Sequence, residues 1–333
     1  MKNKKNNLPL SEFRQDPVSD DWVLLAPLRG AEHKFEGRIK TSLSKNKCPF
    51  DNLTKFGNAP PVLVYQNDKG TDWFLQIIPN KYPAITPGDC QSINQKDLYR
   101  TQAGVGSHDL IIYRDHSRNL AEFNKQEIHK ILLAFQERYR TLAKDKCVQY
   151  ISIFHNHGKE AGSTVPHPHS QMLSLPIIPP DVSHSINGAK RYFSEHKKCA
   201  HCQVIEKELQ IKKRIVYQNQ EMIVVTPFAS RAEFELRIFP KKHSAHFDKI
   251  EGKELEFLAD ALRSALSKIY QKLKDPAFNF FIHTAPPAKN EKYDYYHWHI
   301  EILPKFDILG GFELGTGADI ITIAPETAAK ILK

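Results

Sequence analysis

The sequence predicts an α+β fold made of two tandem halves, each an antiparallel sheet with packed helices. The main observation is a repeat: a His-Ser pair, an amphipathic helix, a strand, a loop and a second strand that begins His-x-His occur twice in the same order. The spacing is similar as well, because 51 residues separate His116 from His167 and 54 separate His243 from His297. A cysteine motif lies upstream of each copy.

The first copy predicts the helix and strands of the N-terminal half. Asn124 and Glu127 form a capping-box pattern at the start of a helix. Apolar residues then recur at helical spacing, at Ile128, Ile131, Leu132, Phe135, Tyr139 and Leu142. Residues 150–154 are rich in β-branched and aromatic side chains and predict a strand, and residues 167–173 predict the strand that follows the loop.

The second copy repeats this order in the C-terminal half. Its predicted helix carries one apolar stripe, made of Leu255, Leu258, Leu262, Leu266, Ile269 and Leu273. Strands are predicted at 278–282 and 297–304. Prolines between residues 176 and 180 end the first half, so we predict domains at residues 1–180 and 181–333.

Length and charge exclude some classes of protein. The 333 residues contain no run of about 18 apolar residues, and no apolar stretch follows the basic N-terminus, so we expect a cytoplasmic protein with no membrane span. The net charge of +9 comes from Lys and Arg residues spread along the chain without interleaved aromatics, which disfavours nucleic acid as a partner. Small anionic substrates such as nucleotide sugars, or a solvated basic surface, explain the charge equally well.

Five cysteines are present, and their odd number argues against a disulfide framework. Cys90 and Cys147 have no partner pattern, so they are expected to be buried or half-buried thiols. The other three belong to the two upstream motifs.

Each half offers four candidate metal ligands. In the second half they are Cys199, Cys202, His243 and His297, which together suit a closed, structural zinc site. In the first half they are Cys48, Asp51, His116 and His167. Asp51 stands where a second cysteine would complete the pattern, and its carboxylate makes a harder site that is expected to hold zinc less tightly. Unrelated surface and core positions remain the alternative for both sets.

The run His167-Pro168-His169-Ser170-Gln171 carries the candidate chemistry. Alternate strand residues share a face, so His167, His169 and Gln171 point the same way. With His167 on the metal, His169 is presented as a nucleophile or general base toward a phosphate, and Gln171 as a hydrogen-bond donor. The alternative is that both histidines bind one ion.

The loop before this strand suits phosphate, since glycines let backbone N–H groups approach an anion. It spans residues 156–164 and includes Asn156, Gly162, Ser163 and Thr164. The equivalent loop of the second half, 284–290, has prolines and no glycine. We therefore place the chemistry in the first half, and interpret His299 and Glu301, the counterparts of His169 and Gln171, as structural.

Several motifs now match one family. They are RQDPV at 14–18, CPF at 48–50, PNKYPA at 79–84, DHS at 115–117 and HPHSQ at 167–171. With these motifs the chain resembles, nearly end to end, the galactose-1-phosphate uridylyltransferase family, a duplicated branch of the histidine-triad superfamily. The resemblance implies two histidine-triad-like halves, bound zinc and a possible homodimer.

The resemblance also implies a ping-pong reaction. His169 would displace hexose 1-phosphate from a UDP-hexose, hold the nucleotide covalently and pass it to a second phosphate, while Gln171 contacts the transferred phosphate. The substrate contacts that it implies are Arg29, Asn80, Tyr82, Asn156, Gly162, Ser163, Thr164 and, near the hexose, Gly311 and Phe312.

The sequence departs from the family at its C-terminal segment. Residues 310–317 read GGFELGTG, which is similar to an ADP-glucose phosphorylase-like branch that transfers AMP to inorganic phosphate. A UDP-glucose:hexose-1-phosphate uridylyltransferase is the first hypothesis and an ADP-glucose phosphorylase the second. A histidine-triad hydrolase or nucleotide-binding regulator is the third, and Gln171 disfavours it because an uncharged amide gives no acid assistance to hydrolysis. A two-zinc scaffold is the last.

Overall fold

One large antiparallel sheet forms the centre of the protein in the computed structural model, which describes residues 10–30, 37–38, 42–90, 93–287, 292–306 and 308–333. Its ten strands run in the order β10-β11-β12-β14-β13-β8-β9-β7-β4-β3. The N-terminal strands are β3 (Leu63–Gln66), β4 (Trp73–Pro79), β7 (Ser107–Tyr113), β8 (Tyr150–His157) and β9 (His169–Leu175). The C-terminal strands are β10 (Ile215–Gln218), β11 (Met222–Val225), β12 (Leu236–Pro240), β13 (Ala277–His283) and β14 (His299–Lys305).

The two halves meet in the middle of this sheet. Each half contributes five neighbouring strands, and β8 pairs with β13, with Phe154 opposite Phe281 and Asn156 opposite Asn279. The predicted fold of two antiparallel halves is confirmed. The structure also shows that the edge strands of the two halves pair to make one continuous sheet. The repeat pattern predicted two packed units but not this pairing.

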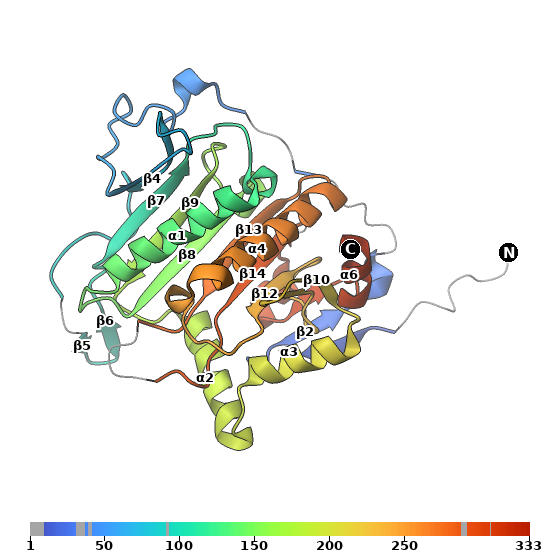
Figure 1. The fold of residues 1–333 in the computed structure, drawn as a ribbon. Helices are drawn as coiled ribbons and strands as arrows, with labels where there is room; N and C mark the ends of the chain where they lie inside the picture. The colour runs from blue at the N-terminus through green and yellow to red at the C-terminus, as the bar shows by residue number, and fades with distance from the viewer. Residues whose placement is uncertain (1–9, 31–36, 39–41, 91–92, 288–291, 307) are drawn as a thin grey trace.

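Two long helices cover one face of the sheet side by side, α1 (Lys125–Leu142) and α4 (Gly252–Lys272) (Figure 1). The Asn124 side chain caps α1 by accepting a hydrogen bond from the backbone N–H of Glu127. The Glu127 carboxylate in turn accepts one from the backbone N–H of Asn124, as the sequence predicted. The apolar stripes of both helices are buried in one core with the sheet. The other face is therefore left for smaller elements and for the site.

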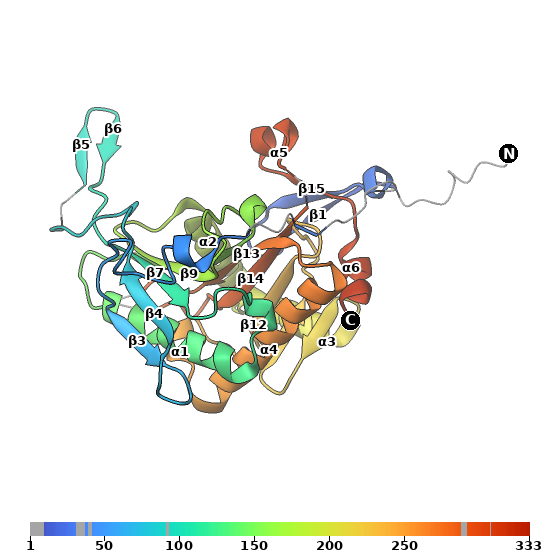
Figure 2. The same ribbon diagram turned by 90° about the horizontal axis from the view of Figure 1, so that it is seen from above.

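The remaining elements border this sheet. They are the three-stranded sheet of β1 (Glu12–Gln15), β2 (Trp22–Leu25) and β15 (Asp319–Ile321), the hairpin of β5 (Asn94–Lys96) and β6 (Tyr99–Thr101), and the helices α2 (Pro180–His196), α3 (Ala200–Ile211), α5 (Gly311–Thr316) and α6 (Pro325–Leu332). Short 3-10 turns occur at η2 (Pro27–Gly30), η3 (Lys45–Lys47), η4 (Leu120–Glu122), η5 (Lys159–Ala161) and η6 (Phe247–Lys249). Figure 2 shows the β5–β6 hairpin and α5 projecting on the side opposite α1 and α4.

Strands β9 and β14 begin two residues later than predicted, at His169 and His299. In the first half, Pro168 has no backbone N–H to continue the ladder with β7. The side-chain alternation still extends backward, because the rings of His167 and His169 both contact Phe50 edge-on.

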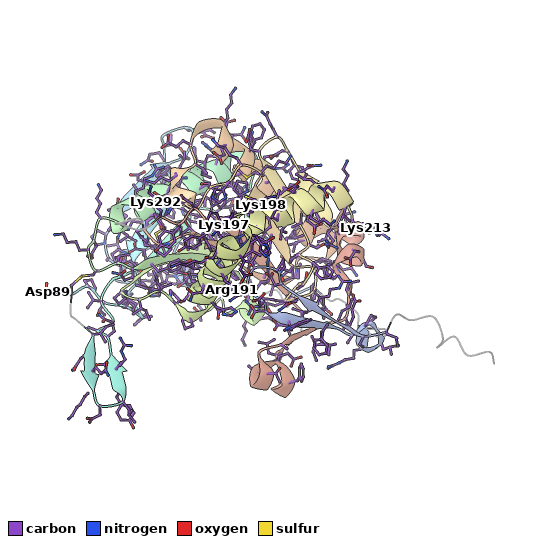
Figure 3. All side chains as sticks on the ribbon, turned by 90° about the horizontal axis from the view of Figure 1, so that it is seen from below. Asp89, Arg191, Lys197, Lys198, Lys213 and Lys292 are labelled. Atoms are coloured by element: carbon purple, nitrogen blue, oxygen red, sulfur yellow. A yellow bond between two sulfur atoms is a disulfide. The ribbon has the colours of Figure 1, made fainter. Side chains whose placement is uncertain are left out.

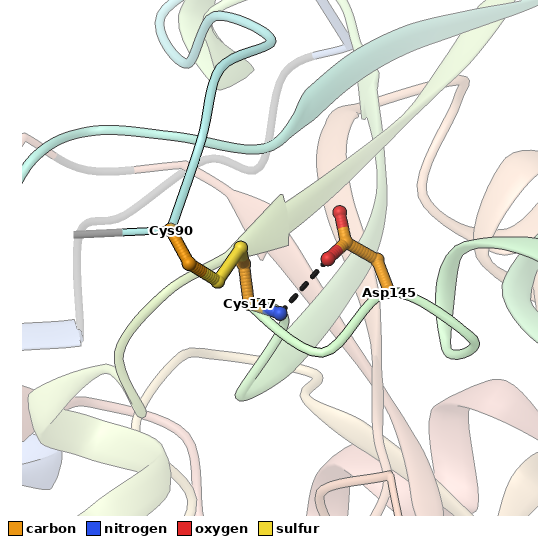
Figure 4. The surroundings of a disulfide bond; sticks show 3 residues. All are labelled: Cys90, Asp145 and Cys147. Carbon is orange, nitrogen blue, oxygen red and sulfur yellow. Dashed lines mark hydrogen bonds between the residues drawn. A yellow bond between two sulfur atoms is a disulfide. The ribbon is translucent and has the colours of Figure 1, made fainter.

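The expectation that Cys90 and Cys147 are free thiols is wrong, because they form a disulfide with Cα atoms 5.3 Å apart (Figure 4). Cys147 lies in the turn between α1 and β8, and its N–H donates to Asp145 Oδ1 at 2.8 Å. Cys90 lies in the segment that links β4 to the β5–β6 hairpin. The two cysteines are separated by 57 positions in the sequence, which leaves no local pattern from which the pair could be predicted.

No helix among the described residues is long and apolar enough to cross a membrane. Exposed basic residues are distributed over the face that carries α2 and α3 (Figure 3). Those labelled there are Arg191, Lys197, Lys198, Lys213 and Lys292.

Candidate active site

His169 starts a central strand of the sheet and points to the face opposite α1. In β9 the residues Ser170 and Met172 are fully buried, and Met172 belongs to the core under the helices. Because side chains alternate along a strand, His169 and Gln171 share the other face. The local sequence therefore aims both candidate catalytic side chains away from the core.

The hydrogen bonds of His169 fix its tautomer. Its Nδ1 lies 2.9 Å from the carbonyl oxygen of His167, and a carbonyl only accepts, so Nδ1 carries the proton. Nε2 then keeps a free lone pair. The side chain is 6% exposed, and burial lowers its pKa to about 4, so the ring is neutral near pH 7. A neutral imidazole with a free Nε2 is the form needed for nucleophilic attack.

The loop after β8 has the backbone that close approach to an anion requires. Gly162 has a φ of +86°, and a Cβ added to it would lie 3.8 Å from Asn156 Nδ2, so its bare Cα faces that amide. Ser163 Oγ donates to the carbonyl of Val165 at 3.0 Å, and Thr164 is exposed. The structure thus brings Asn156 and Gly162 together, while the Ser163 hydroxyl is engaged within the loop.

Asn279 was missed by the sequence reasoning, although it organises this loop from the other half. Its Nδ2 donates at 2.8 Å to Asn156 Oδ1 and at 2.8 Å to the carbonyl of Ala161. Because Asn156 Oδ1 is held in this way, its Nδ2 is turned toward Gly162. The pairing of β8 with β13 creates this contact, so no local pattern in the sequence could have revealed it.

His108 was also missed, and it lies between two predicted site residues. Its Nε2 is 2.8 Å from Gln171 Oε1, and Asn80 Nδ2 lies against the same ring. Asn80 directly follows β4, and its N–H donates to the His108 carbonyl at 2.8 Å. Tyr82 is 80% exposed close by. The segment from Asn80 to Tyr82 therefore borders Gln171 through His108.

The four candidate ligands of the first half converge, with their donor atoms within 4.8 Å of one another. His116 Nε2 lies 2.6 Å from the carbonyl of Leu43, and His167 Nε2 lies 2.6 Å from the carbonyl of Tyr113. Both histidines therefore carry their proton on Nε2 and turn a lone pair on Nδ1 inward. Cys48 Sγ is 3.4 Å from His167 Nδ1.

The donor set of the first half fits a cation. Asp51 Oδ2 is buried without a hydrogen-bond donor among the described residues, yet it contacts Nδ1 of His116 and lies 3.5 Å from Nδ1 of His167. A carboxylate oxygen and two nitrogen lone pairs repel one another when nothing positive lies between them. The Asp51 carboxylate thus takes the place of the second cysteine in space as well as in sequence.

The second quartet converges in the same way. Cys202 Sγ is 3.3 Å from His243 Nδ1 and 3.4 Å from His297 Nδ1. Ligands of tetrahedral zinc at normal bond lengths lie about 3.6 Å apart, so this spacing fits zinc. His297 Nε2 lies 3.0 Å from the carbonyl of Pro240, which leaves its Nδ1 free for a metal.

The position equivalent to His169 in the second half has different electrostatics. His299 donates from Nδ1 to the His297 carbonyl at 3.0 Å, as His169 does to His167. However, its Nε2 faces the Glu301 carboxylate at 3.4 Å, and Glu301 is in turn 3.0 Å from Arg237. The Arg237 guanidinium lowers the pKa of Glu301 despite its burial, so the carboxylate is charged. A carboxylate here repels a phosphate, which supports placing the chemistry in the first half.

Arg29, Gly311 and Phe312 belong to the elements η2 and α5, which carry none of the other predicted contacts. Arg29 is exposed in η2, directly after β2. Phe312 is 44% exposed in α5, which projects from the body of the protein (Figure 2). No hydrogen bond or ion pair between described residues links Arg29 or Phe312 to His169. Their predicted role at the substrate therefore stays a prediction.

Comparison with known proteins gives matches over nearly the whole chain. The family model for the N-terminal domain of galactose-1-phosphate uridyl transferase matches residues 2–179, and a model for the C-terminal binding part of the scavenger mRNA decapping enzyme matches residues 198–311. An ADP-glucose phosphorylase of Arabidopsis thaliana is 34% identical over 97% of this chain and 92% of its own length.

A galactose-1-phosphate uridylyltransferase of Thermotoga maritima is 28% identical over 97% of this chain and 98% of its own length. Among solved structures, an Arabidopsis thaliana ADP-glucose phosphorylase with bound ADP-glucose superposes with a TM-score of 0.81. That alignment has 33% identity and covers 97% of this chain and 98% of the other.

Proposed function

The chain belongs to the galactose-1-phosphate uridyl transferase family, and on that premise we propose that it moves a nucleotidyl group from a nucleotide sugar to a phosphate acceptor through His169. The observation that carries this proposal is the state of His169. Its ring is neutral, its Nδ1 proton is held by the His167 carbonyl, and its Nε2 lone pair is free on the open face of the sheet.

In the first step, His169 Nε2 attacks the α-phosphorus of the nucleotide sugar. A P–N bond forms, the bond between the α-phosphorus and the bridging oxygen breaks, and hexose 1-phosphate leaves with the electron pair. Positive charge develops on the ring as Nε2 binds phosphorus, and the His167 carbonyl at Nδ1 stabilises it. Positioning and charge neutralisation dominate such a barrier, which is the role we assign to the 156–164 loop and to Gln171.

In the second step, a phosphate oxygen of the acceptor attacks the same phosphorus and the P–N bond breaks, so His169 recovers its lone pair. A Gln171 amide contacts the phosphoryl oxygens without offering an acidic proton to a leaving group. Hydrolysis of the nucleotidyl-histidine by water therefore receives no acid assistance, and the nucleotidyl group stays on His169 until a phosphate acceptor binds.

We propose that zinc occupies both quartets. In the first half Cys48, Asp51, His116 and His167 would hold it, and in the second Cys199, Cys202, His243 and His297. With four protein ligands each, the ions serve as structural clamps. In the first half such a clamp fixes His167, whose carbonyl orients the His169 ring.

We propose ADP-glucose as the nucleotide sugar and inorganic phosphate as the acceptor. Supporting this choice are the 34% identity to a plant ADP-glucose phosphorylase and the GGFELGTG segment at 310–317, which lies in and beside α5. Uridylyl transfer from UDP-glucose to a hexose 1-phosphate is the second candidate. It is favoured by the match of residues 2–179 to the uridyl transferase model.

The test is a two-by-two comparison of the purified protein with ADP-glucose or UDP-glucose as donor and phosphate or galactose 1-phosphate as acceptor. Our proposal predicts ADP and glucose 1-phosphate from ADP-glucose and phosphate, with parallel double-reciprocal lines of ping-pong kinetics. UDP-galactose formed from UDP-glucose and galactose 1-phosphate supports the second candidate. No turnover in any of the four reactions would refute both.

We also propose that two copies form the working enzyme. Arg29 in η2 and Phe312 in α5 make no hydrogen bond or ion pair with His169 among the described residues, and we assign their role at the substrate to a site shared with a neighbouring copy. Mixing a His169→Asn variant with a Phe312→Ala variant tests this. Recovery of activity on exchange of subunits supports a shared site, and its absence in a mixture shown to contain hybrids contradicts it.

A further inference from the structure

We propose that His108 is a positioning residue that sets the amide orientation of Gln171 and couples it to the segment that follows β4, residues 80–84. This inference rests on the proposed function, because Gln171 matters only where a phosphoryl group is transferred. No motif in the sequence pointed to His108. Its place is defined by hydrogen bonds that join three separate parts of the first half.

The tautomer of His108 is fixed by the backbone. The N–H of Ala84 lies 3.1 Å from His108 Nδ1, and a backbone nitrogen only donates. Nδ1 is therefore an acceptor, and the ring proton sits on Nε2. This assignment does not depend on how any side-chain amide is placed.

The proton on Nε2 then orients Gln171. His108 Nε2 lies 2.8 Å from Gln171 Oε1, so the ring donates and the amide oxygen accepts. The opposite amide orientation would set an N–H group against an N–H group and is disfavoured. The Gln171 amide nitrogen is thus turned away from His108, and no described residue accepts a hydrogen bond from it. Two N–H groups remain available on the face that carries His169.

The Asn80 side chain packs against the same ring. Its Oδ1 accepts the N–H of Tyr82 at 3.0 Å, which identifies the other amide atom as Nδ2. That Nδ2 lies 3.5 Å from His108 Nδ1 and 3.2 Å from Nε2, so it lies against the ring beside both nitrogens. Because Nε2 carries the proton, the Asn80 amide N–H cannot donate to it, so residues 80–84 hold the ring through the hydrogen bond from Ala84 while Asn80 packs against it. A nucleotide that packs on this segment stabilises the ring position and, through it, the donor orientation of Gln171.

A different role for His108 is chemical, as an acid that protonates the departing sugar phosphate. The observed contacts disfavour it, since the Nε2 proton is already donated to Gln171 and Nδ1 accepts from Ala84. A ring with hydrogen bonds at both nitrogens can orient Gln171 but has no proton directed at a substrate. The positioning role and the acid role differ in which substitution of His108 preserves activity.

The first experiment compares His108→Gln with His108→Leu. The amide nitrogen of a glutamine reaches about as far as Nε2 of a histidine and also donates, so it replaces the contact but not an acid. With His129→Leu in α1 as the control, single-turnover nucleotidylation is followed at saturating nucleotide sugar. We expect His108→Leu to slow the step about tenfold or more and His108→Gln to remain within about threefold of the wild type.

A double-mutant cycle then tests whether His108 acts through Gln171. Gln171→Leu should cost about as much as His108→Leu, and the double variant should be no slower than Gln171→Leu alone. The inference is overturned if the fold-decrease in nucleotidylation rate of the double variant equals the product of the fold-decreases of the two single variants. So does a His108→Gln variant as slow as His108→Leu, which would indicate acid catalysis.

A second readout does not require activity. Long-range ¹⁵N–¹H correlation spectra of histidine-labelled protein, with His108 assigned from the His108→Gln variant, report which ring nitrogen carries the proton. The Nε2–H tautomer supports the inference, and an Nδ1–H tautomer or a doubly protonated ring near pH 7 overturns it. Failure of the wild type to form any nucleotidyl adduct instead refutes the proposed function, and the tautomer result remains interpretable by itself.

Discussion

Lowering the pH from about 7.5 to about 5 tests the environment of His169, because burial lowers its pKa to about 4. A group with that pKa is still about 90% neutral near pH 5, whereas a histidine with its ordinary pKa is only about 3% neutral there. Nucleotidylation depends on the neutral ring, so its rate should change by less than about twofold over this range. An ordinary histidine would lose about 30-fold.

The assay is rapid-quench mixing with nucleotide sugar, followed by intact-protein mass spectrometry at each pH. A rate that halves near pH 6.5 would refute the reasoning, since it would show that His169 is not protected from protonation. Circular dichroism at each pH is the necessary control, because acid also destabilises the fold.

Buried histidines with a lowered pKa take up protons when the protein unfolds. They therefore leave the free energy of unfolding unchanged above about pH 6.5 and lower it as the pH falls toward 4, by up to about 1.4 kcal/mol per pH unit for each group.

Three further predictions concern the contacts around the site. Asn279→Ala removes two hydrogen bonds from the 156–164 loop and should lower kcat/KM about tenfold, measured against Asn187→Ala on α2 as a control. Asp51→Cys turns the first quartet into a Cys2His2 set, so elemental analysis after dialysis against a chelator should find more zinc than in the wild type. Reductant should lower the free energy of unfolding by up to about 4 kcal/mol through loss of the Cys90–Cys147 bond, and Cys90→Ser should abolish this dependence in urea titrations.

Features encoded by local pattern could be predicted from the sequence. The capping box at Asn124, the apolar stripes of α1 and α4, and the duplicated His-x-His motif all follow from periodicity and spacing, and they were sufficient to predict the fold class. The same repeat brought Asp51 into the first quartet, because it stands at the position of Cys202.

Features that depend on pairing between distant segments could not be predicted. Asn279 reaches Asn156 because β13 pairs with β8, and His108 reaches Gln171 because β7 pairs with β9. Neither pairing leaves a trace in the local composition. The disulfide between Cys90 and Cys147 was missed for the same reason, since it depends on how the segment after β4 folds over the turn between α1 and β8.

The most direct test of the account is to find the nucleotidyl group on the protein. Wild-type protein is incubated with ADP-glucose without acceptor, and the modified peptide is sequenced by tandem mass spectrometry under conditions that preserve P–N bonds. We expect one AMP per chain on His169, none in His169→Asn, and release as ADP when phosphate is added. An adduct on His299 or on any other residue, or catalytic turnover by His169→Asn at the wild-type rate, would contradict it.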